Sequence, residues 1–245
     1  MNLPLAAGIP FHPPTNASAI VDIVLRWIHF VAGITWVGLL YFFNLVNVPF
    51  MRQANAQTKS VVIPKMVAPA MWWFRWGGLL TVLAGLFYWM KIGGTDARNG
   101  GTNPGFLFTS FFVIWVVAFV LQMGMLMGGL GGGIIAIGET VVMIAAALTF
   151  LGLNNHDWES NRALSIGVGG GLGLVMLLNV WGLIWRANKK VIQWTEQNGA
   201  SGAVLPDDLA RFSRKAYLAS RVNFALSFPM LFFMAAASHY PIFGR

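Results

Sequence analysis

The chain has 245 residues, of which 57% are hydrophobic and only 10% are charged, against roughly 25% charged in an ordinary soluble domain. This composition, the mean hydropathy of +0.66 and several apolar runs of the roughly 18 to 25 residues that cross a bilayer exclude a soluble globular protein. The absence of cysteine excludes disulfides, thiolate metal sites, iron–sulfur clusters and covalently attached c-type haem. The net charge of +8 is unevenly distributed along the chain, which favours a role in membrane topology over nucleic-acid binding.

Residues 1–19 contain no Lys or Arg and are interrupted by Pro10, Pro13 and Pro14. A secretory signal peptide begins with basic residues, so we expect this segment to be a retained, extended tail outside the membrane. His12 lies in this tail and is expected to be solvated.

Six apolar segments follow, and each is long enough for a transmembrane helix. They cover residues 20–47, 70–90, 106–127, 131–153, 163–185 and 217–238. The predicted fold is an all-α helical bundle, with residues 20–245 as a single transmembrane domain. Residues 186–216 are polar and form a predicted cytoplasmic excursion. Pro206-Asp207-Asp208 resembles a helix start, so we expect one or two short amphipathic helices there.

The basic residues predict the orientation, because Lys and Arg accumulate on cytoplasmic loops. The first and fifth loops carry nine of them, whereas the opposite side carries four. With six spans, both termini then lie outside, which is the periplasm of a bacterium. The predicted location is therefore the bacterial cytoplasmic membrane, spanned several times.

Two histidines lie near the outer face in this topology. His29 is on the first span, and His239 is at the outer end of the sixth. They come within roughly two helical turns of each other in depth, so they could provide both axial ligands of one b-type haem through neutral imidazole nitrogens. The simpler alternatives are a histidine hydrogen-bonded to a neighbouring helix for His29, and an interfacial position beside Tyr240 for His239. His156, in the external loop, is expected to be solvated.

Arg26 precedes His29 by three residues and shares its helix face. A guanidinium there could bind a haem propionate bidentately. Alternatively, Arg26 reaches the lipid headgroups or pairs with Asp22.

Other polar and small residues within the spans admit two interpretations. Glu139 is the one acid well inside a span, where it could serve a proton path, a quinone contact or a hydrogen bond to a neighbouring helix. Arg75 and Arg221 lie near inner helix ends and are expected to reach the headgroups. Glycines on three spans suit either close approach of a flat cofactor or ordinary helix packing. These are Gly33, Gly77, Gly78, Gly85 and several positions from Gly167 to Gly173.

Four segments together resemble the membrane domain of the bacterial cytochrome-c-linked urate oxidases, which forms the N-terminal part of those enzymes. They are "LRWIHFVAGITWVGLLYFFNL", "WWFRWGGLLTVLAGLFYW", "VMLLNVWGLIWRANKKVI" and "SRVNFALSFPMLFFMAAASHYPIF". The first is more distantly similar to the haem-associated membrane protoporphyrinogen oxidase of bacteria. The resemblance implies a membrane haem site and highlights His29 and His239.

The chain also departs from that family. The urate enzymes usually continue into a cytochrome c domain, but the sequence ends at Arg245 without a CxxCH motif. The last helix begins "SRVNF" instead of with a histidine followed by asparagines, and Gly77-Gly78 replaces an acidic position of the second helix. A relative that retains haem without the urate reaction is therefore expected, with a separate external cytochrome c in place of the missing domain.

The leading hypothesis is a membrane protein with one haem b that transfers electrons near the outer face, with a quinone, an external cytochrome c or a larger membrane complex as partner. One alternative is a non-catalytic subunit that stabilises a respiratory or photosynthetic complex, and a second is a urate-oxidase-like oxidoreductase. A transporter is disfavoured, because no span shows the paired, interrupted half-helices typical of one.

Overall fold

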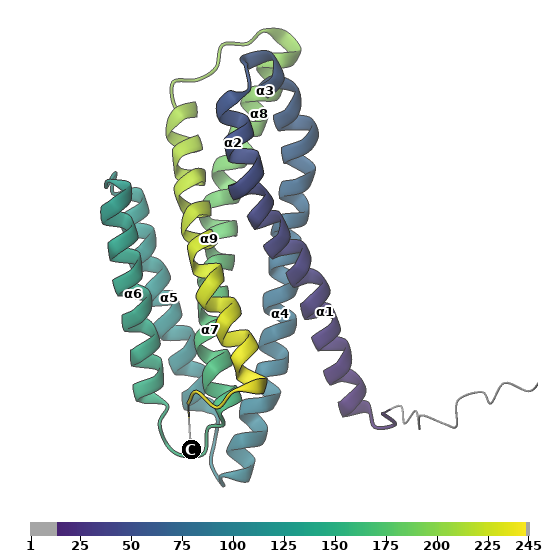
Figure 1. Cartoon of the computed structure of the whole chain (residues 1–245), viewed down its shortest axis with the longest axis vertical. Coiled ribbons are helices and arrows are strands. Elements are labelled where there is room, and N and C mark those ends of the chain that lie inside the picture. Colours follow the sequence, from purple (N-terminus) through teal and green to yellow (C-terminus); the bar gives the residue numbers. More distant parts are fainter. Residues whose placement is uncertain (1–13, 244–245) are drawn as a thin grey trace, which may run out of the picture.

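The computed structural model describes residues 14–243, and most of these residues are helical (Figure 1). The described part is all-helical and contains no strand. The α-helices are α1 Ala17–Tyr41, α2 Val48–Gln53, α3 Ala56–Val62, α4 Ala68–Asn99, α5 Gly105–Met127, α6 Gly132–Leu153, α7 Asn161–Asn179, α8 Trp185–Ser201 and α9 Leu209–His239. Three π-helical segments join some of them: η1 Phe42–Asn47, η2 Ile63–Val67 and η3 Val180–Ile184.

These segments form six continuous helices that are long and apolar enough to cross a membrane. Their ranges are Ala17–Gln53, Ala56–Asn99, Gly105–Met127, Gly132–Leu153, Asn161–Ser201 and Leu209–His239. Each overlies one predicted span, so the predicted number and order of long apolar helices are confirmed. The predicted tail at residues 1–19 ends in the first turn of α1, and residues 1–13, with His12, lie outside the described part.

The helices differ in length mostly at one end, although α4 also extends past α5 and α6 at the other end (Figure 1). We call the end with the start of α1 and the end of α9 the outer end, following the predicted orientation, and the opposite end the inner end. The α5 and α6 helices have 23 and 22 residues, about 34 Å, which is slightly more than a hydrocarbon core of about 30 Å. Helices of 37, 44 and 41 residues reach roughly 55 to 66 Å. Their surplus length projects beyond the α5–α6 turn at the inner end (Figure 1).

The predicted excursion at 186–216 belongs to this projection. Asp208 precedes α9 directly, so the predicted helix start is at the right place. Separate short amphipathic helices are not formed, however, because α8 continues from α7 through η3 and α9 runs without interruption into the sixth span. Only residues 202–208 connect the two long helices.

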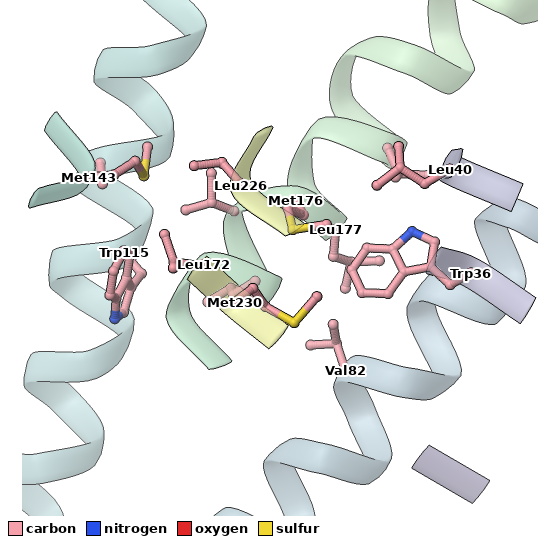
Figure 2. Packing of buried hydrophobic residues seen from close by; sticks show 14 of the residues in the cluster. Trp36, Leu40, Val82, Trp115, Met143, Leu172, Met176, Leu177, Leu226 and Met230 are labelled. Carbon is pink, nitrogen blue, oxygen red and sulfur yellow. The ribbon is translucent and has the colours of Figure 1, made fainter. Parts of the chain in front are cut away.

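The central helix is α7. In the most apolar 18-residue stretch of the long helix that contains α7, 83% is buried inside the bundle. The corresponding share is 17–39% for the other five long helices. Its glycines allow this packing: the Trp115 indole and the Phe150 ring lie where a side chain at Gly171 or Gly167 would be. Most of the predicted glycine positions therefore serve helix packing. Figure 2 shows the apolar core on both sides of α7, from Trp115 on α5 to Trp36 on α1.

Candidate functional site

His29 is held in the interface between α1 and α4. Its Nδ1 lies 2.7 Å from the carbonyl oxygen of Thr81, and a carbonyl can only accept, so Nδ1 carries the hydrogen. In the neutral imidazole, Nε2 then has a free lone pair. Histidines that bind metals typically show this arrangement, in which a second hydrogen bond fixes the tautomer and the ring orientation.

Gly85 makes room for the imidazole on α4. A Cβ atom at this position would lie 2.7 Å from Nδ1 and 2.8 Å from Cε1 of His29, which is closer than side-chain atoms pack. The carbonyl of Thr81 is one turn before Gly85, so the missing side chain lets the ring reach that oxygen. The glycine is therefore part of the His29 site.

Arg26 also faces α4, as expected for a residue one turn from His29. Its guanidinium carbon lies 5.8 Å from the centre of the Tyr88 ring, and the side chain is exposed. The expected alternative, in which Arg26 pairs with Asp22, is wrong: Asp22 forms its ion pair with Lys91 of α4. That partner leaves the Arg26 guanidinium without a carboxylate among the described residues.

His239 is the last residue of α9 and is exposed. His29 lies twelve residues after the start of α1, about 18 Å along the helix axis, because α1 begins earlier than the predicted span. The hydrogen bonds and ring contacts that tie α1 and η1 to α9 occur further inward, at Tyr41 with Phe224, Phe228 and Ser227 and at Asn44 with Ser220. From there the two helices diverge toward the outer end (Figure 1). The structure thus places the two histidines on separated stretches and in no direct contact.

A shallow depression of about 660 Å³ lies at the outer end of α4. Its lining includes three cations, Lys91, Arg98 and Arg162, and two acids, Asp22 and Asp96. Tyr88, which stacks with Arg26, also lines it. Asp22 forms an ion pair with Lys91, and Asp96 accepts hydrogen bonds from the backbone N–H and hydroxyl of Ser160. With three cations against two acids, the lining carries one net positive charge on the outer side of the His29 site.

His156 belongs to the outer loop rather than to this site. Its ring nitrogen lies 2.9 Å from the Glu159 carboxylate, and its backbone N–H donates to the same side chain at 3.0 Å. The ring is exposed, as predicted. Within residues 14–243, no three His, Asp or Glu side chains gather closely enough to hold a metal ion by themselves.

A chain of buried amides crosses the bundle near the inner ends of α5 and α7, and sequence reasoning missed it. Gln122 of α5 donates to Asn179 of α7 at 2.8 Å, Asn179 donates to Asn223 of α9 at 2.7 Å, and Asn223 donates to the carbonyl of Met176. All three side chains are fully buried. The only sequence signal is an amide inside each of three apolar runs, which does not reveal their pairing.

Glu139 lies in α6 with 5% of its surface exposed, and neither carboxyl oxygen has a partner among the described residues. The predicted hydrogen bond to a neighbouring helix is therefore not formed in the described part. An unpaired carboxylate in hydrocarbon costs several kcal/mol, so this group either carries a proton or meets a partner outside residues 14–243.

The Arg75 guanidinium on α4 packs against the rings of three tryptophans. Its guanidinium carbon is 4.0 Å from the ring centre of Trp185, 5.1 Å from Trp181 and 5.5 Å from Trp76. Such cation–π contacts stabilise a desolvated cation by about 2 kcal/mol. Arg221 instead donates from Nε to the Tyr217 hydroxyl at 3.2 Å. The expectation that both simply reach the headgroups is corrected: each is held by aromatic side chains of the chain itself.

Comparison of the chain with family models, with curated proteins and with solved structures found no match. The resemblance to the urate oxidase membrane domain therefore stays a prediction.

Proposed function

We propose that the protein spans the bacterial cytoplasmic membrane with both termini outside and binds one haem b near the outer face, with Nε2 of His29 as an axial ligand. The observation that carries the proposal is the hydrogen bond from Nδ1 of His29 to Thr81. It fixes the tautomer that leaves Nε2 free, and Gly85 makes the position possible. The bound haem would supply one-electron chemistry.

Arg26 is the proposed partner of a propionate. Its guanidinium has no carboxylate of the described chain to neutralise it, because Asp22 is paired with Lys91. Arg98 and Arg162 at the outer depression add to the positive charge on this side. A haem whose two propionates point outward would therefore be stabilised at this end of α1 and α4.

His239 is the proposed second axial ligand. It lies at the same end of the bundle, on the helix that diverges from α1 (Figure 1). His29 lies about 18 Å inward from the start of α1, whereas His239 ends α9, so ligation of one iron by both would require the outer part of α9 to approach His29. An electron would be exchanged at the outer face, with a quinone, an external cytochrome c or a larger membrane complex as partner.

The test is a reduced-minus-oxidised absorption spectrum of the purified protein and of two single variants, His29→Ala and His239→Ala. We expect a b-type band in the parent and its loss in His29→Ala. In His239→Ala we expect a shift to a high-spin, five-coordinate spectrum. His156→Ala, in the outer loop, serves as the matched control and should leave the band unchanged.

A full b-type band in His29→Ala would contradict the ligand assignment. Purification of the parent with large membrane partners and without any bound haem would instead favour the structural-subunit alternative.

A further inference from the structure

A cavity of about 460 Å³ lies at the inner end of the bundle, and its lining includes none of His29, His156 and His239. All three π-helical segments contribute to its wall, with Phe43 and Asn47 from η1, Ile63 and Val67 from η2, and Ile184 from η3. The π-helical turns are rare, and they occur frequently at functional sites because they widen the helix and redirect its side chains. The presence of three π-helical segments around one cavity indicates that the cavity is a binding site.

The cavity lies where the predicted membrane ends. The η3 segment begins directly after the 19 residues of α7, about 28 Å from its outer end, which is close to the thickness of the hydrocarbon core. The α3 and α8 helices, which also line the cavity, belong to the part that projects beyond the α5–α6 turn. The site therefore bridges the inner edge of the hydrocarbon and the headgroup layer.

The floor of the cavity is apolar and buried. Met71 and Phe74 of α4, Val67 of η2 and Ile184 of η3 each expose less than a tenth of their surface. Two of the five hydroxyl groups in the lining donate to a carbonyl of their own helix, Ser60 to Gln57 and Thr195 to Val191. These groups need no hydrogen bond from a ligand, so the floor suits a hydrocarbon chain.

The rim of the cavity is polar and positively charged. Lys59 lines it directly, and no Asp or Glu is among its described lining residues. The Tyr217 hydroxyl accepts from Nη2 of Arg52 at 3.4 Å and from Nε of Arg221 at 3.2 Å, which leaves its own hydrogen free to donate. The buried Oδ1 of Asn47 has no partner among residues 14–243.

We propose that this cavity binds one anionic phospholipid, with an acyl chain on the apolar floor and the phosphate at Lys59 and Tyr217. The Tyr217 hydroxyl donates to the phosphate while Arg52 and Arg221 supply charge behind it. The Asn47 amide meets the polar backbone of the lipid. Basic pockets between helices on the cytoplasmic side are typical binding sites for acidic headgroups.

The test is native mass spectrometry of the full chain in a neutral detergent, titrated with dioleoyl phosphatidylglycerol or with dioleoyl phosphatidylcholine. We expect one tightly bound phosphatidylglycerol and clearly weaker binding of phosphatidylcholine. Lys59→Ala should weaken phosphatidylglycerol binding about fivefold, the contribution of one cation at a charged interface. Tyr217→Phe should weaken phosphatidylglycerol binding further. It removes the hydroxyl that donates to the phosphate and that accepts hydrogen bonds from Arg52 and Arg221.

Lys189→Ala, an exposed α8 lysine outside the cavity, is the charge-matched control and should bind like the parent. Ala216→Phe places a ring in the cavity and should abolish binding of either lipid. Equal binding of both lipids, or equal weakening in Lys59→Ala and Lys189→Ala, would overturn the proposal. Displacement of the lipid by millimolar inorganic phosphate alone would also overturn it, since the site would then recognise only an anion.

Discussion

At the scale of single residues, the hydrogen bond from His29 to Thr81 decides which ring nitrogen is available. Without it, the imidazole could rotate or adopt the other tautomer, and Nε2 would not be presented in one direction. The partner is a backbone carbonyl, so substitution of the Thr81 side chain would not remove it. The position of His29 depends instead on how closely α1 approaches α4, and Gly85 controls that distance.

Gly85→Ala tests this dependence. The added methyl group would lie 2.7 Å from Nδ1 of His29, so the ring must move away from the Thr81 carbonyl. We expect a weakened or shifted haem spectrum and a loss of stability of about 1–3 kcal/mol, measured by absorption and by thermal unfolding in detergent.

Gly38→Ala on α1 is the matched control, because nothing lies within 4 Å of a Cβ at that position. It should retain the spectrum and gain up to about 1 kcal/mol from the higher helix propensity of alanine. Identical spectra for Gly85→Ala and Gly38→Ala would show that the glycine does not set the imidazole position.

At the scale of the elements, hydropathy predicted the six long apolar helices. It did not predict that some of these helices continue beyond the apolar runs. The six apolar runs are long, so their existence and order follow directly from the sequence. The junctions did not follow, because the three π-helical segments lie inside uninterrupted helical patterns and carry no signal of their own. The polar stretch after residue 185 was expected to begin a new element, but it extends α7 instead. Polarity there marks the end of the predicted span and not the end of the helix.

The amide chain gives the elements their lateral order, and Asn179→Ala tests it. Asn179 both accepts from Gln122 and donates to Asn223, so its loss leaves Nε2 of Gln122 and Oδ1 of Asn223 buried without a partner. We expect the free energy of unfolding to fall by about 1–2 kcal/mol, measured by denaturant titration in mixed micelles. Asn188→Ala removes only a bond to a carbonyl of its own helix and should cost less. Equal losses would show that the amides do not couple the helices.

At the scale of the whole molecule, the chain is a six-helix bundle with a projection at one end, and the predicted orientation makes that end cytoplasmic. The inner cavity and the predicted haem site then lie on opposite sides of the membrane. The site residues were predictable in part. His29 and Arg26 stood out as polar residues in an apolar run. Thr81 could not be recognised, because its contribution is a backbone carbonyl. Gly85 was named only as one of several glycines, and its contact with His29 did not follow from the sequence.

The orientation can be tested cleanly because the chain has no cysteine. Asn155→Cys lies in the exposed loop between α6 and α7, and Ala203→Cys lies in the loop between α8 and α9. A membrane-impermeant maleimide should label Asn155→Cys in intact spheroplasts, and Ala203→Cys only after permeabilisation. The reverse pattern would invert the topology and place His29 toward the cytoplasm.

The most direct test of the account is the haem content of the purified protein. A pyridine haemochrome assay together with protein quantification gives the number and type of haems per chain without reference to any variant. The account predicts one haem b per chain, retained through gel filtration in mild detergent. A protein that is folded and monodisperse but has less than a tenth of a haem per chain, even after expression with added haem precursor, would contradict it.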